Sequence, residues 1–230
     1  MKLRNGLLVA AGLLATFSTL PLQADSITNG SFESPVVPAG AFTNFGNGSI
    51  LINGWTVVGA PGGVSIVGGT FTQNGITFPA ENGNQWLDLT GNGVNSNEGV
   101  EQFFATTVGA AYTLSFWVGN VNNPGGIFGT TSTVDVLLND SQIAQATNSN
   151  TTTGTQTWEQ FTTTFTATSA TSSLLFVNGD PASDNSNGLD NISVNLSGTT
   201  PPPTVPEPST LLLLGSGSLG LLGWARKKLA

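Results

Sequence analysis

The chain has 230 residues, of which 13 are acidic and five are basic, and it contains neither His nor Cys. The basic residues are confined to the two ends, at Lys2, Arg4, Arg226, Lys227 and Lys228, so residues 25–205 carry twelve carboxylates and no cationic side chain. This segment lacks the Lys and Arg of nucleic-acid binding, the His and Cys of nucleophilic triads and zinc sites, and any disulfide, so we expect no nucleic-acid partner.

The first predicted element is an export signal over residues 1–24. Lys2 and Arg4 form a positive region, residues 7–20 are apolar, and Leu22-Gln23-Ala24 can serve as a cleavage site. We therefore expect the Sec machinery to export the chain, and we expect the mature protein to start at Asp25.

Residues 25–198 are predicted to form one all-β domain. Apolar runs rich in β-branched and aromatic residues alternate with Gly, Asn, Pro and Ser, and no stretch shows a 3.6-residue apolar period. The predicted strands are 27–33, 55–59, 64–67, 85–90, 100–106, 112–119, 134–138, 142–146, 158–167, 174–177 and 189–196. Many short strands joined by Gly- and Asn-rich loops favour a jelly-roll β-sandwich.

Alternation within the strands separates a core from an outer face. Side chains on a strand point to opposite faces in turn, so the apolar residues of 112–118 share one face and Trp117 falls on the other. Trp86 and Trp158 are out of phase with the core residues of their strands in the same way. The predicted core residues are Phe32, Trp55, Leu87, Leu89, Leu114 and Phe116.

The three out-of-phase indoles suggest a carbohydrate platform. An exposed indole can stack on the apolar face of a pyranose, and neighbouring polar side chains can bind its hydroxyls, as in small-ligand sites generally. The candidate residues are Trp86, Asp88, Gln102, Trp117, Asn120, Trp158 and Gln160. The alternative is that these tryptophans pack under loops.

The order of motifs in the domain resembles a known family. The motifs are TNGSFESP at 28–35, GWTV at 54–57, GVSIV at 63–67, QWLDLTG at 85–91, GVEQFFAT at 99–106, YTLSFWVGN at 112–120 and LDNISV at 189–194. This order is similar to the domain-of-unknown-function family 642 and to choice-of-anchor family C proteins, although the cysteines of the plant family are missing here. The resemblance implies a galactose-binding-like jelly roll associated with polysaccharide.

The same resemblance implies a structural calcium ion. In carbohydrate-binding jelly rolls the two chain ends often lie side by side, and an acidic residue from each end commonly binds Ca²⁺ together with backbone carbonyls. By their order in the chain, Glu33 and Asp190 occupy the matching positions. The alternative is that both carboxylates cap turns and strand ends.

The C-terminal part is predicted to be a sorting signal. A Thr/Pro linker at 199–205 precedes Val205-Pro206-Glu207-Pro208, an apolar stretch from Leu211 to Trp224, and the basic stop Arg226-Lys227-Lys228. Residues 206–230 resemble the PEP-CTERM signal of Gram-negative bacteria, which implies an exosortase partner and a single hydrophobic helix that holds the chain in the inner membrane before processing. The alternative is a single-span tail anchor.

Together these patterns predict an exported, non-enzymatic protein of the cell surface or extracellular matrix that associates with polysaccharide. A second hypothesis is a structural or adhesive matrix protein that binds no sugar. A third is a glycosidase, because Asp88, Glu98 and Glu101 cluster in the sequence and two carboxylates can hydrolyse a glycoside; the alternative is that these are ordinary loop and strand residues.

Overall fold

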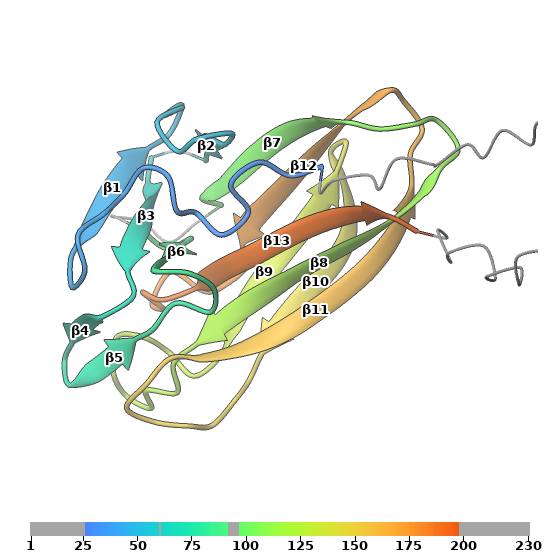
Figure 1. Cartoon of the computed structure of the whole chain (residues 1–230). Coiled ribbons are helices and arrows are strands. Elements are labelled where there is room, and N and C mark those ends of the chain that lie inside the picture. Colours follow the sequence, from blue (N-terminus) through green and yellow to red (C-terminus); the bar gives the residue numbers. More distant parts are fainter. Residues whose placement is uncertain (1–25, 60, 92–96, 198–230) are drawn as a thin grey trace, which may run out of the picture.

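The computed structural model describes residues 26–59, 61–91 and 97–197, and in these ranges it contains β-strands and no helix. One sheet has six strands in the order β1 (Phe42–Gly46), β3 (Gly63–Gly68), β6 (Gln85–Asp88), β13 (Gly188–Leu196), β8 (Ala111–Asn120) and β11 (Thr157–Thr166). A second has five strands in the order β10 (Ser141–Asn148), β9 (Ser132–Leu138), β12 (Thr171–Asn178), β7 (Gly99–Ala105) and β2 (Thr56–Val58). Strands β4 (Phe71–Gln73) and β5 (Ile76–Phe78) form a separate hairpin at one end of the molecule (Figure 1).

The two large sheets form an antiparallel sandwich around one main core, which confirms the predicted fold class. Strand β8 alternates as the sequence indicates, with Leu114, Phe116 and Val118 fully buried and Trp117 on the opposite face. Across the core, the ring of Phe116 contacts that of Phe176 in β12, with centroids 5.2 Å apart. All six predicted core residues are buried.

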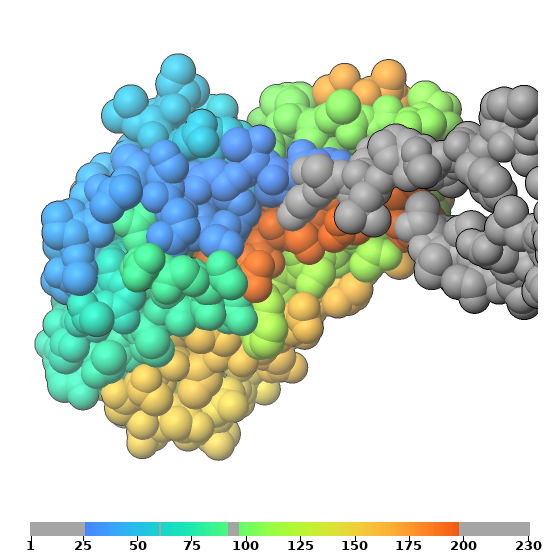
Figure 2. All heavy atoms as spheres, viewed as in Figure 1, coloured from blue at the N-terminus to red at the C-terminus, as the bar shows by residue number. Residues whose placement is uncertain are grey.

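The segment 27–33 was predicted as a strand, and this prediction is wrong. Asn29 and Phe32 have positive φ angles of 55° and 53°, so the segment turns instead of extending. It nevertheless lies beside β13, because Ser26 donates its N–H to the carbonyl of Val194 and Ile192 donates to that of Gly30. Figure 2 shows this segment in blue against the orange-red β13, so the two ends of the domain lie side by side as expected.

Strands β1, β4 and β5 were not predicted, and the hairpin β4–β5 contributes to a second, smaller core on the outer face of the six-stranded sheet. The sheet contributes Val67 and Trp86, and the hairpin contributes Ile76 and Phe78. Val121 and Phe128 come from the segment that links β8 to β9. The sandwich therefore has one outer face that is partly covered.

The predicted export signal, linker and C-terminal helix lie outside the described residues. Within the described ranges, no helix is long and apolar enough to span a membrane.

The close approach of the segment 26–33 to β13 predicts the effect of adding a single methyl group. A Cβ at Gly30 would lie 2.0 Å from the carbonyl oxygen of Ile192, whereas a Cβ at Gly46 would meet nothing within 4 Å. We expect Gly30→Ala to lower the free energy of unfolding by about 1–3 kcal/mol through steric overlap with the backbone. Denaturant unfolding measures this, with Gly46→Ala as the matched control; equal stability of the two variants would contradict the prediction.

Candidate functional site

A pocket lies on the outer face of the six-stranded sheet, where three neighbouring strands present their non-core residues. The strand register places Phe42 opposite Val67, and Val67 opposite Trp86. In the adjacent row, Ser65 lies opposite Asp88. Because Ile66 and Leu87 point into the main core, alternation directs these neighbours outward.

The hairpin β4–β5 and two loops surround this outer face and leave a cavity of about 320 Å³. Phe71, Gln73 and Phe78 come from the hairpin, Ile127 and Phe128 from the segment before β9, and Asn185 from the segment before β13. The indole N–H of Trp86 donates to the carbonyl of Phe78 at 3.3 Å and joins the hairpin to the sheet. The cavity is thus bounded by packed elements.

The aromatic residues of the pocket divide into a floor and a rim. Trp86, Phe78 and Phe128 are at most 2% exposed and contact one another, with Phe78 stacked on Trp86 and edge-on to Phe128. Phe42 at the rim is 49% exposed and meets the half-buried Phe71 edge-to-face at 5.4 Å. The floor gives the pocket its shape, and the rim provides the apolar surface that a ligand can contact.

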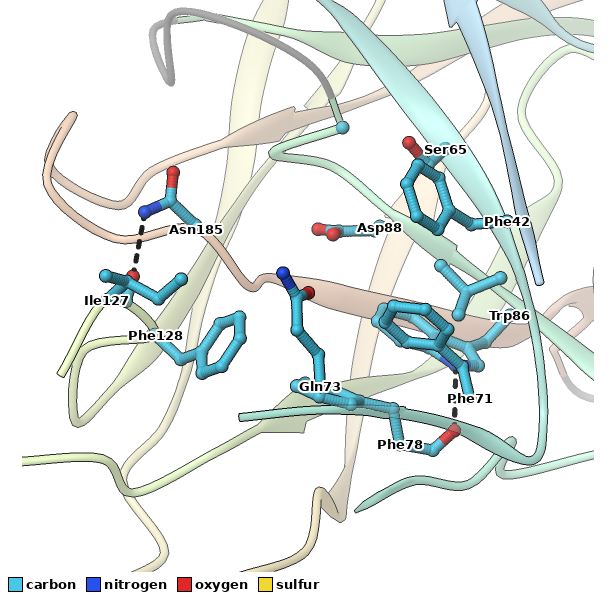
Figure 3. A pocket seen from close by; sticks show the side chains of 12 residues that line it. Phe42, Ser65, Phe71, Gln73, Phe78, Trp86, Asp88, Ile127, Phe128 and Asn185 are labelled. Carbon is cyan, nitrogen blue, oxygen red and sulfur yellow. Dashed lines mark hydrogen bonds between the residues drawn. The ribbon is translucent and has the colours of Figure 1, made fainter. Parts of the chain in front are cut away.

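Asp88 is the acidic residue of the pocket lining. Its Oδ1 accepts hydrogen bonds from the backbone N–H of Thr90 at 3.0 Å, from the Thr90 hydroxyl at 2.7 Å and from the N–H of Asn187 at 3.2 Å. No hydrogen bond from the described residues reaches Oδ2. The side chains of Asp88 and Gln73 point toward the same open space, whereas the amide of Asn185 donates to the carbonyl of Ile127 at 2.9 Å (Figure 3). Burial raises the pKa of Asp88 to about 6, although these hydrogen bonds oppose the shift.

Two further aspartates lie close to Asp88, in the segment between β12 and β13. Burial, together with repulsion from Asp184, raises the pKa of Asp180 to about 8. Burial also raises the pKa of Asp184 to about 7, and Asp88 contributes to that shift. The pocket therefore borders an acidic region with no cationic side chain among the described residues.

Trp86 and Trp158 come together on this face as the phase of their strands predicts, but neither is a freely exposed indole. Trp158 is half-buried, donates its indole N–H to Pro79 at 2.9 Å, and contacts Trp86 edge-on at 5.9 Å. Its ring passes over Gly119 and Gly188, where an added Cβ would lie 2.9 Å and 3.0 Å from it. Trp158 therefore packs against Trp86 in the aromatic floor. The alternative that these tryptophans pack under other segments describes Trp158 and Trp86 better than an exposed platform does.

The remaining candidates of the carbohydrate platform are dispersed. Trp117 and Gln160 are neighbours in register on the outer face of β8 and β11, beyond the pocket. Gln102 lies in the other sheet, where its amide binds the backbone N–H and carbonyl of Thr28. Asn120 is buried and donates to the carbonyls of Thr130 and Asn150. The side-chain amides of Gln102 and Asn120 therefore hold backbone segments.

Glu33 and Asp190 approach the same loop from the two ends of the domain. Glu33 Oε1 accepts the N–H groups of Asn84 and Gln85 at 2.7 and 2.9 Å. Asp190 Oδ2 accepts those of Glu81 and Asn82, each at 3.0 Å. Burial raises the pKa of Asp190 to about 8.

These contacts supply N–H donors rather than the oxygen ligands that Ca²⁺ requires. Among the described residues, no group of three or more His, Cys, Asp or Glu side chains could hold a metal ion. Calcium at Glu33 and Asp190 stays a prediction.

The three carboxylates of the glycosidase hypothesis do not share the pocket. Glu101 lies on β7 in the five-stranded sheet, whereas Asp88 lies on the outer face of the six-stranded one. Glu98 is fully buried, next to Gly62. Of the three, Asp88 alone lines the cavity.

Most of the pocket lining escaped the sequence analysis. Phe42, Phe71 and Phe128 lie in segments where no strand was predicted, and Gln73 and Asn185 lie in loops or hairpins rich in polar residues. The available signal was the repeated Phe within Gly- and Asn-rich stretches at 42–46, 71–78 and 127–129, because exposed loops seldom contain so many aromatic rings.

Two family matches cover most of the chain. Residues 23–180 match the HpiC1-like family, described as HpiC1 cyclase, and residues 204–227 match the PEP-CTERM protein-sorting motif. The sorting motif implies export, with sorting to the cell surface by an exosortase in a Gram-negative bacterium. The likeness to domain-of-unknown-function family 642 stays a prediction. No curated protein matches the sequence.

Solved structures agree with the sandwich fold. The Stig cyclase Fisc from Fischerella sp. TAU, in complex with (3Z)-3-(1-methyl-2-pyrrolidinylidene)-3H-indole, has a TM-score of 0.53 and 18% identity and covers 75% of this chain and 96% of that one. A family 35 carbohydrate-binding module from an environmental isolate has a TM-score of 0.34 and 20% identity, covering 47% and 72%. The cyclase shares the fold, and the module's likeness adds nothing to the assignment.

The four shifted aspartates predict that the domain becomes less stable as the pH rises. Each folded-state pKa lies above the ordinary value of 3.8, at about 6 for Asp88, about 7 for Asp184 and about 8 for Asp180 and Asp190. At a pH between 3.8 and its folded-state pKa, each of these carboxyl groups keeps its proton in the folded protein but has lost it in the unfolded chain. Stability is therefore greatest below about pH 4 and falls as the pH rises to about 8.

Melting temperatures between pH 4 and pH 9 check this slope. We expect Asp180→Asn to flatten it, because the amide cannot ionise, and we expect the exposed control Glu159→Gln to leave it unchanged. A melting temperature that climbs toward pH 8 would contradict the prediction and would mean that a bound cation compensates the ionised carboxylates.

Proposed function

The chain belongs to the HpiC1-like cyclase family, and from this premise we propose that the exported protein binds one sugar ring of a polysaccharide in the pocket above β3 and β6, without converting it. One observation carries the proposal. A single cavity brings the exposed ring of Phe42 together with the polar side chains of Asp88, Gln73 and Asn185.

This combination suits the two kinds of surface on a pyranose. The C–H groups of one sugar face are apolar and can lie on an aromatic ring, while the hydroxyls around the edge need hydrogen-bond partners. Phe42 and Phe71 offer the ring surface at the rim. The Oδ2 of Asp88, which no hydrogen bond from the described residues reaches, can accept from a hydroxyl, and the amide of Gln73 can both donate and accept.

The size and rigidity of the pocket favour a single ring. About 320 Å³ is at the lower end of the range for small-molecule sites. The floor of Trp86, Phe78 and Phe128 is already packed, so little ordering free energy is lost when a ligand binds. A terminal sugar of a surface polysaccharide meets both conditions, and the sorting motif delivers the protein to the compartment where such polymers occur.

Acid catalysis is a second candidate, favoured by Asp88 itself. A carboxyl group with a pKa of about 6 beside an aromatic floor can donate a proton near neutral pH. Glycoside hydrolysis normally needs two carboxylates, and Asp88 is the single carboxylate among the described lining residues. A reaction catalysed by Asp88 would therefore be a ring closure rather than hydrolysis, as the name of the family also suggests. Mass spectrometry of a bound ligand before and after incubation separates the two candidates, because conversion that is lost in Asp88→Asn would establish an enzyme.

Sugar binding predicts that the rim rings matter more than other exposed rings. We expect Phe42→Ala to weaken binding of the best ligand on a glycan array about tenfold, because a stacked ring contributes about 1 kcal/mol beyond its buried area. Isothermal titration calorimetry with that ligand measures the change.

Two control variants accompany this measurement. Phe103→Ala removes a ring that is 67% exposed on β7 of the other sheet, so binding should not change. Trp117→Ala tests the platform beyond the pocket, and a larger loss in Trp117→Ala than in Phe42→Ala would move the site to β8 and β11. Absence of any glycan ligand for the intact protein would refute sugar binding.

A further inference from the structure

We infer that the sugar recognised in this pocket carries a protonated amine, so that the natural ligand is a cationic amino sugar. The inference rests on the proposed sugar binding and goes beyond it by naming the charge of the ligand. It follows from the position of Asp88, the rings at the rim and the distribution of charge around them.

The first argument is that Asp88 has no cationic partner among the described residues. Residues 25–205 contain no Lys, Arg or His, so no side chain of this segment can supply a positive charge to the carboxylate. The three hydrogen bonds from Thr90 and Asn187 all end on Oδ1, and no hydrogen bond from the described residues reaches Oδ2. An ammonium group has three donors and no acceptor, and it therefore complements an acceptor-only carboxylate oxygen.

The second argument concerns the aromatic rim. Phe42 and Phe71 expose ring surface at the same cavity that Asp88 lines. A cation within about 6 Å of a ring centroid is attracted by the electrons of the ring face. A protonated amine on a sugar that stacks at the rim would gain from the rings and from the carboxylate together, whereas a neutral hydroxyl gains mainly from the carboxylate.

The third argument is the field around the pocket. Repulsion from Asp88 contributes to the raised pKa of both Asp184 and Asp180, so the three carboxylates lie close together, and each neighbour adds negative potential once it ionises. A sugar with a carboxylate or sulfate would be repelled, and a neutral sugar would leave the charge of Asp88 uncompensated. Among sugars, the cationic class fits this field best.

Binding of three matched sugars to the purified protein tests the inference. The probes are the methyl glycosides of glucosamine, N-acetylglucosamine and glucose, together with the corresponding galactose series, measured by calorimetry or by the fluorescence of Trp86 at pH 7. We expect the free amine to bind at least about tenfold more tightly than its acetylated and hydroxyl counterparts, because hydrogen bonds between charged groups are the stronger ones.

Variants locate the preference. We expect Asp88→Asn to abolish the advantage of the amine while some binding of the neutral sugars persists, since the rim rings remain. Glu159→Gln, which removes an exposed carboxylate on β11, should keep the full preference. In the unmodified protein, affinity for the amine should fall by about tenfold per pH unit below about pH 6, where Asp88 gains its proton.

The pH dependence of amine binding also reports on the neighbouring aspartates. It is measured on the unmodified protein, so it does not require any variant to fold. Asp184 and Asp180 become charged as the pH rises through their pKa values of about 7 and about 8, and they should then strengthen amine binding until the amine itself loses its proton. Equal affinity for the three sugars of a series would overturn the inference and leave sugar binding intact. Failure of all six probes and of every arrayed glycan would overturn both.

Discussion

The structure depends on a constraint of charge, namely that carboxylates must be accommodated in a domain without cationic side chains. An isolated buried charge is very costly, so a buried carboxylate is expected to accept N–H groups or to keep its proton. Glu33 and Asp190 accept backbone N–H groups of the loop 81–85, and Asp88 accepts those of Thr90 and Asn187. Main-chain amides thus take the place that Lys and Arg occupy in other proteins, and four aspartates retain raised pKa values.

The hydrogen bonds between these carboxylates and backbone N–H groups link the two ends of the domain to the pocket. The loop held by Glu33 and Asp190 leads directly into β6, which carries Trp86 and Asp88 outward. On the far side of Asp88, the N–H of Asn187 fixes the entry to β13, and Trp158 lies across Gly188 to support Trp86. The position of the Asp88 carboxylate on the outer face of the sheet is therefore set by contacts from both ends of the domain.

The sequence predicted the sandwich because its central strands alternate strictly, as β8 illustrates with Leu114 and Phe116 inside and Trp117 outside. It also predicted that Trp86 and Trp158 point away from the main core between the two sheets. It failed at 27–33, where positive φ angles at Asn29 and Phe32 turn a strand-like composition into a turn. The pocket could not be predicted as a unit, because its lining joins segments from 42 to 185 that only the register of β1, β3 and β6 and the position of the hairpin bring together.

The two functions considered for Asp88 exclude each other for a given ligand. A proton donor must hold its proton when the ligand arrives, and burial raises the pKa of Asp88 toward that state. A cation in the pocket stabilises the ionised carboxylate and lowers the same pKa, so the proton is released before it can be donated. A cationic ligand therefore makes the pocket a binding site, whereas a neutral, apolar ligand would leave Asp88 protonated and able to act as an acid. If the proposed site is correct, the charge of the ligand would decide between binding and conversion, because the fold shared with a cyclase does not fix the function.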